Sequence, residues 1–459
     1  MIDFAKISNI WFIGIGGIGM SALARYFAEG GFRIAGYDRT ESPLTRELLA
    51  GGIEVIYKDD PGAIPGEYLE KEKTLVIYTP AISPENKIAG FFRTSGFSMY
   101  KRAEILGLLS KRGRTIAIAG THGKTSLTTI AAHLLKQSSI DCTAFLGGIS
   151  KNYRTNMLTG RGDIIVMEAD EYDRSFHHLS PEMALITSVD ADHLDVYGSY
   201  ENMLIAYRKF TEKIKEGGRL LVNEKIATRL PGPENVQLYT YGMNPAADFY
   251  AAEISVEKGA YKFNIHSPMG IINDLCLPIP GKMNIENTVG AVALARLAGV
   301  EDDEIRKALI YYSGVVRRFD VRISSDELVY IDDYAHHPAE IDNCIGSVRE
   351  FYGEKRICGI FQPHLFTRTR DHADAFAAAL DKLDRLILLP VYPAREEEIE
   401  GVDSGMIFNR MKLQDKILAA KNEVPDIIAS EKIEILLTMG AGDIDRLVEP
   451  LEKLLRKRL

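Results

Sequence analysis

The residues with the clearest chemical potential lie in a short glycine-containing segment, residues 120–126, which reads Gly-Thr-His-Gly-Lys-Thr-Ser. An apolar segment precedes it, and apolar residues at helical spacing follow it. A strand, a glycine turn and a helix can bind phosphate, because backbone N–H groups and the helix N-terminus both favour an anion. The Lys124 ammonium can reach the terminal phosphates of a nucleotide, and the Thr125 hydroxyl can ligate Mg²⁺. We therefore favour a nucleotide site over an ordinary glycine turn, although Ile118 replaces the first glycine of the common pattern.

Two clusters of acidic side chains follow two other apolar segments. The first cluster, residues 168–171, begins with Glu168, and the second, residues 190–195, contains His193. Carboxylates at the end of a strand beside a phosphate loop are the usual place for Mg²⁺. The two clusters therefore indicate a magnesium site, with two solvated acidic loops as the alternative.

A second glycine motif lies near the N-terminus. Gly14, Gly16 and Gly19 follow the apolar residues 9–13, and Asp38 ends the next predicted strand. This arrangement is the βαβ fingerprint that binds a diphosphate at a helix N-terminus. By itself the fingerprint indicates NAD or FAD.

The C-terminal third carries three polar segments that follow predicted strands or glycine turns. Arg317 and Arg318 suit an anion-binding joint between domains, or are a solvated basic pair. Residues 330–338 end in Asp-Asp-Tyr-Ala-His-His-Pro, and residues 361–371 read Phe-Gln-Pro-His-Leu-Phe-Thr-Arg-Thr-Arg-Asp. Basic residues at the start of a helix are unfavourable unless an anion is bound there, so the last segment indicates an anion site.

These segments require an α/β fold, in which alternating strands and helices form parallel sheets with ligands at the carboxyl ends of the strands. The 459 residues are enough for three domains. We expect a Rossmann-like diphosphate-binding domain over residues 1–107 and a P-loop ATPase-like central domain over residues 108–315. A further α/β domain is expected over residues 316–459.

Composition and charge exclude several classes of protein. The net charge of −9 offers no general surface for polyanions, which argues against nucleic acid or an anionic membrane as the main partner. The four cysteines form no Cys-x-x-Cys pair, and the N-terminus lacks the layout of a signal peptide. No apolar run is long enough to span a bilayer. We therefore expect a cytoplasmic protein that does not associate with membranes.

Taken in order from about residue 12 to residue 443, the motifs resemble those of the Mur ligase family. The resemblance implies an ATP-dependent carboxylate–amine ligase of peptidoglycan precursor synthesis, with a UDP-sugar on the first domain and ATP on the second. Residues 361–369 are most similar to the branch that adds L-alanine to UDP-N-acetylmuramate through an acyl phosphate. The expected partners are UDP-N-acetylmuramate, L-alanine and ATP, with Mg²⁺ as cofactor, in a monomer or weak homodimer.

The resemblance also implies roles for individual residues. The expected UDP-sugar residues are Gly14, Gly16, Gly17, Gly19, Asp38 and Ser83. The expected ATP residues are Gly120, Thr121, His122, Gly123, Lys124, Thr125, Ser126, Asn284, Asn287, Arg317, Asp333 and Tyr334. The expected amino-acid residues are His364 and Arg368, the metal ligands are Thr125, Glu168 and His193, and the catalytic residues are Lys124, His193 and His337. His336 is the alternative to His337 near the reacting centre.

The chain departs from the family pattern at Met283, Ala335 and Leu365, where the family has His, Gly and Arg. Leu365 removes one potential donor from a carboxylate clamp. The closest rival function is the related ligase that recycles an intact tripeptide onto the same UDP-sugar. An NAD-dependent oxidoreductase would leave the phosphate loop unexplained, and a nucleotide-regulated binding protein would leave the acidic clusters unexplained.

Overall fold

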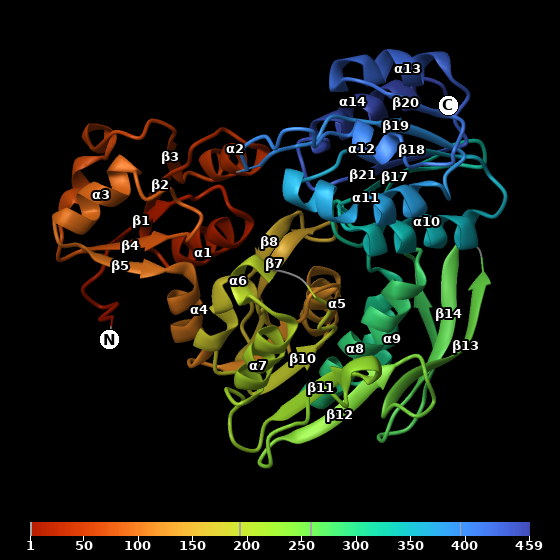
Figure 1. The fold of residues 1–459 in the computed structure, drawn as a ribbon. Coiled ribbons are helices and arrows are strands. Elements are labelled where there is room, and N and C mark those ends of the chain that lie inside the picture. The colour runs from red at the N-terminus through yellow and green to blue at the C-terminus, as the bar shows by residue number, and fades with distance from the viewer. Residues whose placement is uncertain (1, 192–193, 258, 395) are drawn as a thin grey trace. The chain divides into compact units, whose positions relative to one another are not determined.

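The computed structural model describes residues 2–191, 194–257, 259–394 and 396–459. Its elements form three β-sheets with helices on their faces, which confirms the predicted α/β class (Figure 1). Contacts within the chain divide it into two compact units. The first unit contains Met1–Ile254, Lys262–Cys276 and Ile285–Tyr312, and the second contains Ser255–Tyr261, Leu277–Asn284 and Ser313–Leu459. The first unit holds the first sheet and most of the second, so the expected domain boundaries near residues 107 and 315 remain predictions.

The first sheet is parallel and has the strand order β3-β2-β1-β4-β5. Its strands are β1 (Asn9–Ile13), β2 (Arg33–Tyr37), β3 (Glu54–Ile56), β4 (Thr74–Tyr78) and β5 (Ser98–Lys101). The helices of this part are α1 (Ile18–Glu29), α2 (Pro43–Ala50), α3 (Lys87–Thr94) and α4 (Arg102–Ser110). All of β1 is buried, as in a central parallel strand that is covered on both faces. The chain turns at Gly14, where φ is 83° and the backbone N–H donates to the Tyr37 carbonyl at 2.7 Å.

The second sheet has the strand order β15-β14-β13-β12-β11-β10-β6-β9-β7-β8. Its strands are β6 (Arg114–Ala119), β7 (Thr143–Ser150), β8 (Thr155–Leu158), β9 (Ile164–Glu168), β10 (Met183–Ile186), β11 (Arg219–Asn223), β12 (Gln237–Gly242), β13 (Phe249–Glu257), β14 (Ala260–His266) and β15 (Ile272–Leu277). The helices here are α5 (Lys124–Lys136), α6 (Leu194–Tyr197), α7 (Tyr200–Thr211), α8 (Lys282–Ala298) and α9 (Asp302–Ile310).

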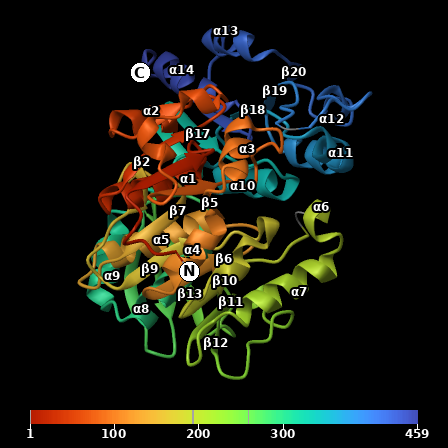
Figure 2. The same ribbon diagram turned by 90° about the vertical axis from the view of Figure 1, so that its left-hand side faces the viewer.

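Strand β6 lies between β10 and β9 and is parallel to both, so the carboxyl ends of these three strands are side by side. The phosphate loop therefore follows a strand beside the one that ends in Glu168, and its Thr121 contacts Ser188 and Asp190 after β10. Helix α7 runs along β10 and β11 (Figures 1 and 2), and its Tyr207 and Phe210 share a buried core with Val222 of β11. Strands β11 to β15 carry none of the motifs, and they were not predicted from the sequence.

The third sheet has the strand order β16-β17-β21-β18-β19-β20, and β16 is antiparallel to β17. Its strands are β16 (Asp320–Ser324), β17 (Val329–Asp333), β18 (Ile357–Phe361), β19 (Arg385–Leu388), β20 (Lys416–Leu418) and β21 (Ile435–Met439). Its helices are α10 (Pro338–Tyr352), α11 (Phe366–Leu380), α12 (Gly405–Phe408), α13 (Val424–Ser430) and α14 (Asp445–Arg456). Helices α10, α11 and α12 share a core with one face of the sheet, and α13 and α14 share a core with the other (Figure 1).

All four cysteines are free thiols, and Cys142, Cys344 and Cys358 are buried. Within the described ranges, none of the helices is both long enough and apolar enough to cross a membrane.

Candidate active site

The phosphate loop joins β6 to α5, in the strand–turn–helix order that the sequence predicts. Gly120 has φ 134°, and a Cβ atom there would lie 1.9 Å from Oγ1 of Thr187. Gly123 has φ 79° and directly precedes α5. Both positions require glycine, because a side chain would be strained at the backbone and would collide at Gly120.

Polar side chains after β10 fix the shape of this loop. The Ser188 hydroxyl lies 2.9 Å from the Thr121 hydroxyl and accepts the His122 backbone N–H at 3.0 Å. The Thr187 hydroxyl donates to the His122 carbonyl at 2.5 Å. Thr121 and His122 therefore hold the loop to the neighbouring strand end, and their contacts with ATP stay predictions.

The Lys124 ammonium is held between two acceptors at the loop. Its Nζ donates to the Gly120 carbonyl at 2.5 Å and to Oε1 of Glu171 at 2.8 Å. The Lys124 side chain is 14% exposed and the Glu171 side chain 2%. Burial is the largest influence and lowers the pKa of Lys124, but the carboxylates of Glu171 and Glu168 raise it, and the net direction is upward. The lysine is therefore a cation where a nucleotide would place its terminal phosphates.

Thr125 and Glu168 lie close enough to share one ligand. The Thr125 hydroxyl donates to Oε1 of Glu168 at 3.3 Å. A Cβ atom on Gly147 would lie 2.0 Å from Oε2 of Glu168, so the backbone of β7 packs directly against this carboxylate. His193, the third expected metal ligand, lies outside the described residues.

Among the described residues, no group of three or more His, Cys, Asp or Glu side chains could hold a metal. Mg²⁺ at a nucleotide site needs only one or two protein oxygens, because phosphates and water supply the other ligands. Thr125 and Glu168 fit that requirement.

The two expected nucleotide asparagines have different surroundings. Asn287 of α8 is buried against the phosphate loop, and a Cβ atom on Gly123 would lie 2.9 Å from its Oδ1. Asn284 belongs to the second unit, and its Nδ2 donates to the Pro280 carbonyl at 2.6 Å. The position of Asn287 therefore supports a nucleotide contact. The bond from Asn284 to Pro280, by contrast, joins residues only four apart in the chain.

The fingerprint turn after β1 is closed by Asp38. Its Oδ2 accepts the Gly16 backbone N–H at 2.8 Å, and a Cβ atom on Gly16 would lie 2.9 Å from the same oxygen. Ser83 is exposed, and its hydroxyl accepts the Glu85 backbone N–H at 3.3 Å. Both side chains thus shape their turns, and their contacts with a UDP-sugar remain predictions.

A cavity of 260 Å³ in the first unit connects the fingerprint turn to the acidic cluster. Its lining includes Gly17 and Gly19 of the fingerprint segment and Glu168 and Asp170 of the first acidic cluster. Arg102, the first residue of α4, also lines this cavity, although no sequence motif indicates it as a site residue. One connected space therefore borders the predicted diphosphate site and the predicted metal site.

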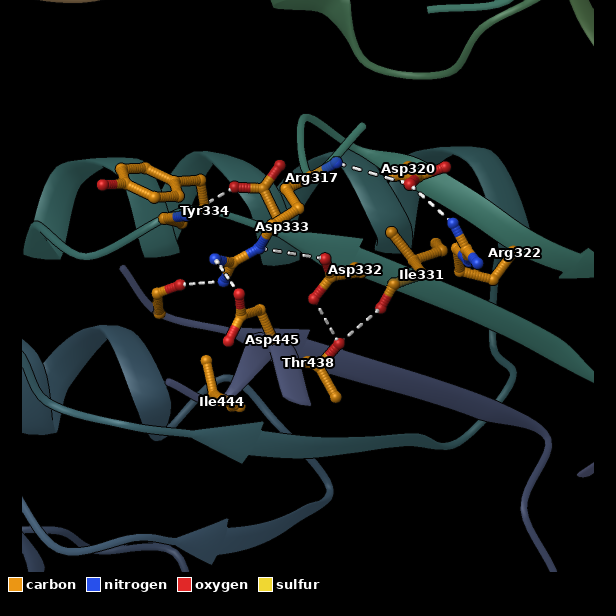
Figure 3. A network of polar contacts seen from close by, with 12 residues as sticks. Arg317, Asp320, Arg322, Ile331, Asp332, Asp333, Tyr334, Thr438, Ile444 and Asp445 are labelled. Carbon is orange, nitrogen blue, oxygen red and sulfur yellow. Dashed lines mark hydrogen bonds and ion pairs between the residues drawn. The ribbon is translucent and has the colours of Figure 1, made fainter. Parts of the chain in front are cut away.

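In the second unit, Asp333 and Tyr334 lie at the carboxyl end of β17 (Figure 3). The Asp333 carboxylate accepts the backbone N–H groups of Phe319 at 2.6 Å and Ala335 at 2.7 Å. Burial raises the pKa of Asp333 to about 6, although Arg318 and these two bonds lower it.

The two adjacent arginines share one aromatic neighbour, but Arg317 also has polar partners at the ends of two strands. Arg317 has φ 63°, and its guanidinium donates to the Gly440 carbonyl at 2.5 Å and to Oδ2 of Asp332 at 3.4 Å (Figure 3). Asp332 is fully buried and also accepts the Thr438 hydroxyl at 2.7 Å. The guanidinium groups of both arginines lie over the Tyr334 ring, that of Arg318 at 4.8 Å and that of Arg317 at 5.2 Å from its centre. Arg317 thus joins the ends of β17 and β21, and its expected contact with ATP remains a prediction.

The two adjacent histidines after β17 have different neighbours. Nδ1 of His336 donates to the Tyr334 carbonyl at 3.0 Å, and the His336 ring centre lies 6.0 Å from that of His364. His337 precedes α10, and its ring centre lies 5.1 Å from that of His372. His336 is therefore the histidine beside the predicted amino-acid residues, while the catalytic role of His337 stays a prediction.

The predicted amino-acid residues come together at the start of α11. Nη1 of Arg368 lies 3.4 Å from Nδ1 of His364. Leu365 has φ 71°, an uncommon backbone conformation for leucine, and its N–H donates to the Tyr392 carbonyl at 3.0 Å. The Glu396 carboxylate accepts the Thr367 backbone N–H at 3.0 Å and the Thr367 hydroxyl at 2.5 Å. Glu396 therefore supplies one anion that the sequence argument requires at this helix start.

Comparison with known proteins identifies the family. The Mur ligase family catalytic domain matches residues 9–114, the Mur ligase middle domain residues 118–295, and the Mur ligase glutamate ligase domain residues 317–442. A UDP-N-acetylmuramate--L-alanine ligase of Parabacteroides distasonis is 48% identical over 459 residues, which is 100% of this chain and 99% of the relative. An enzyme of the same name from Porphyromonas gingivalis is 45% identical over 453 residues, with 98% of this chain and 99% of the relative covered. The chain belongs to the Mur ligase family and is an ATP-dependent ligase.

Solved structures agree with this assignment. The UDP-N-acetylmuramate-alanine ligase of Thermotoga maritima has a TM-score of 0.82 and 27% identity, with 97% of this chain and 99% of that chain covered. A murein peptide ligase of Psychrobacter arcticus has a TM-score of 0.69 at 19% identity, with 98% of each chain covered, and shows the fold alone.

Proposed function

We propose that this protein joins L-alanine to the carboxylate of UDP-N-acetylmuramate, using ATP, in peptidoglycan precursor synthesis. The observation that carries the proposal is the cavity that borders the fingerprint turn and Glu168 at once. A UDP-sugar whose diphosphate lies at the turn extends through that space toward the phosphate loop. The alanine ligases that match nearly all of this chain support the same substrates.

Amide formation needs an activated carboxylate, because an oxide is a poor leaving group. A carboxylate oxygen of the sugar attacks the γ-phosphorus of ATP, ADP leaves, and an acyl phosphate forms. The alanine nitrogen then attacks the acyl carbon, phosphate leaves with the C–O bond electrons, and the nitrogen loses a proton. The protein contributes position and charge rather than a covalent nucleophile.

The phosphate loop residues act in the first step. The Lys124 cation stabilises the charge that develops between the β- and γ-phosphates, and the Gly120 and Glu171 contacts hold it in place. Thr125 and Glu168 would hold Mg²⁺. The metal would neutralise phosphate charge there.

The second unit contributes to the amine step. His364 and Arg368 bind the carboxylate of alanine, and Arg368 takes the larger share because Leu365 offers no donor. Asp333 and Tyr334 contact the nucleotide, and His193 and His337 are the further catalytic residues. The three domains have the boundaries expected from the sequence. The enzyme works in the cytoplasm as a monomer or weak homodimer.

A phosphate-release assay distinguishes this function from the alternative functions. Purified protein with ATP and UDP-N-acetylmuramate should release phosphate when L-alanine is added, and much less when the intact tripeptide is added. Turnover with the tripeptide but not with alanine would favour the recycling ligase. NADH binding without any response to UDP-N-acetylmuramate would favour an oxidoreductase.

A further inference from the structure

Arg102 lies inside the cavity that joins the fingerprint turn to the acidic cluster. It is the first residue of α4, which follows β5 directly. No glycine motif or acidic cluster includes it. Its position in the cavity places a cation where a ligand could bind.

The guanidinium lies directly on the backbone of the fingerprint turn. A Cβ atom on Gly19 would lie 2.1 Å from Nη1 of Arg102 and 2.9 Å from its Cζ. Any side chain at Gly19 would therefore displace the arginine. The third glycine of a dinucleotide fingerprint ordinarily permits close packing of helix and strand. In this chain it permits the approach of an arginine to the diphosphate-binding turn.

The ion pair of Arg102 leaves most of its N–H donors able to bind an anion. Its Nη2 donates to Oδ2 of Asp170 at 3.1 Å, and its side chain is 21% exposed. Asp170 is its one recorded polar partner in the part of the chain that the structure describes. A guanidinium has five N–H donors, so this single ion pair engages a minority of them. Gly19 lies in the first turn of α1, where a cation is unfavourable unless a negative group lies between it and the helix.

We propose that Arg102 binds the diphosphate of the UDP-sugar and that Asp170 positions Arg102 for this contact. The inference rests on the proposed function. The diphosphate is the better candidate than the sugar carboxylate, because Nη1 lies against Gly19 and the reacting carboxylate must lie near the phosphate loop. The planar guanidinium matches two phosphate oxygens at once, which an ammonium cannot do.

Two UDP-sugars distinguish the two anions. UDP-N-acetylmuramate carries both a diphosphate and a carboxylate, whereas UDP-N-acetylglucosamine carries only the diphosphate. Calorimetric titration of the Arg102→Lys protein should show affinity for both ligands lowered by the same factor, about tenfold or more. Affinity for ADP should be unchanged, since its phosphate loop is separate. Asp170→Asn should lower both UDP-sugar affinities less, and its effect should largely disappear when Arg102→Lys is already present.

The matched control is Arg25→Lys, an arginine of α1 that pairs with Glu47 at 3.0 Å, has a side chain 23% exposed, and does not line the cavity. Its affinities should equal those of the unaltered protein. A loss confined to UDP-N-acetylmuramate would overturn the diphosphate assignment, and unchanged affinity for both sugars would overturn any anion contact. An unaltered protein that binds ADP but neither UDP-sugar would instead overturn the proposed function itself.

Discussion

The ammonium of Lys124 lies 2.8 Å from Oε1 of Glu171, a carboxylate whose side chain is only 2% exposed. Glu171 comes from the segment after β9, and Lys124 is the first residue of α5. An acid beside a phosphate-binding lysine restricts where its ammonium lies and offsets part of its charge. We therefore expect the pair to influence both the rate of phosphoryl transfer and the strength of nucleotide binding.

The first prediction separates these two effects. Glu171→Gln keeps the size of the side chain and an acceptor for Lys124 but removes one negative charge. We expect kcat to fall about tenfold, because a less well positioned cation stabilises the transition state less. ADP should bind as tightly or more tightly, because the loop becomes more positive. Asp173→Asn, which alters an exposed acid paired with Lys101, is the control. Wild-type kcat and ADP affinity in the Gln variant would show that Glu171 is not a positioning residue.

The second prediction concerns Lys124 itself. Lys124→Ala should lower kcat/KM at least about a hundredfold, since the loss of one contact to developing charge costs about 3 kcal/mol or more. Titration with UDP-N-acetylmuramate should give unchanged affinity, because that ligand binds at the fingerprint turn. A folded Lys124→Ala protein with near-normal turnover would contradict the assignment of the phosphate loop.

The sequence predicts the elements that follow apolar periodicity and glycine turns. Strand β6, the loop at Gly120 and helix α5 all lie where the pattern places them, because strand, turn and helix are determined by neighbouring residues. The approach of Glu168 to Thr125 also follows from the sequence, since parallel strands align their carboxyl ends.

Partners that come from distant segments could not be predicted in this way. Glu396 is one of several adjacent acids and Arg102 follows Lys101, so neither stands out in its own segment. Only the folded chain brings Glu396 to Thr367 and Arg102 to Gly19. Arg317 and Arg318 are equivalent in sequence, but the positive φ of Arg317 directs it to Asp332 and Gly440. No local pattern predicts that choice.

The third prediction concerns the metal site. Glu168→Ala should raise the Mg²⁺ concentration needed for half-maximal turnover or abolish turnover, because a carboxylate ligand is lost. The same result is expected for His193→Ala. Glu182→Gln is the control, since Glu182 precedes β10, pairs with Arg114 at 3.1 Å and lies away from the loop. If Mg²⁺ titrations of the Glu168 and His193 variants match those of the control, neither residue is a ligand.

The fourth prediction concerns the amino-acid site at the start of α11. Arg368→Lys should raise the KM for alanine strongly and the KM for ATP much less, because lysine cannot reproduce a bidentate contact with a carboxylate. Leu365→Arg should leave alanine use unchanged or improve it, since it adds a donor. Both KM values come from phosphate-release assays with one substrate varied. An alanine KM unaffected by Arg368→Lys, or a tripeptide preferred to alanine, would favour the recycling ligase.

The last prediction concerns the pH dependence of stability. Burial, with a smaller contribution from Arg368, lowers the pKa of His336 to about 4, although Glu340 opposes the shift. An unfolded histidine titrates near 6.5, so between pH 6.5 and 4 the unfolded chain binds a proton that the folded chain excludes. His336 should therefore cost up to about 3 kcal/mol of stability as pH falls through this window.

His336→Asn removes this titration. Urea unfolding at pH 7.5, 6 and 5 should show the variant gaining stability relative to the unaltered protein as pH falls. His178→Asn, at an exposed histidine, is the control for replacing a histidine by asparagine. A constant stability difference between the His336→Asn and unaltered proteins from pH 7.5 to 5 would mean that His336 takes up its proton equally in the folded and unfolded states.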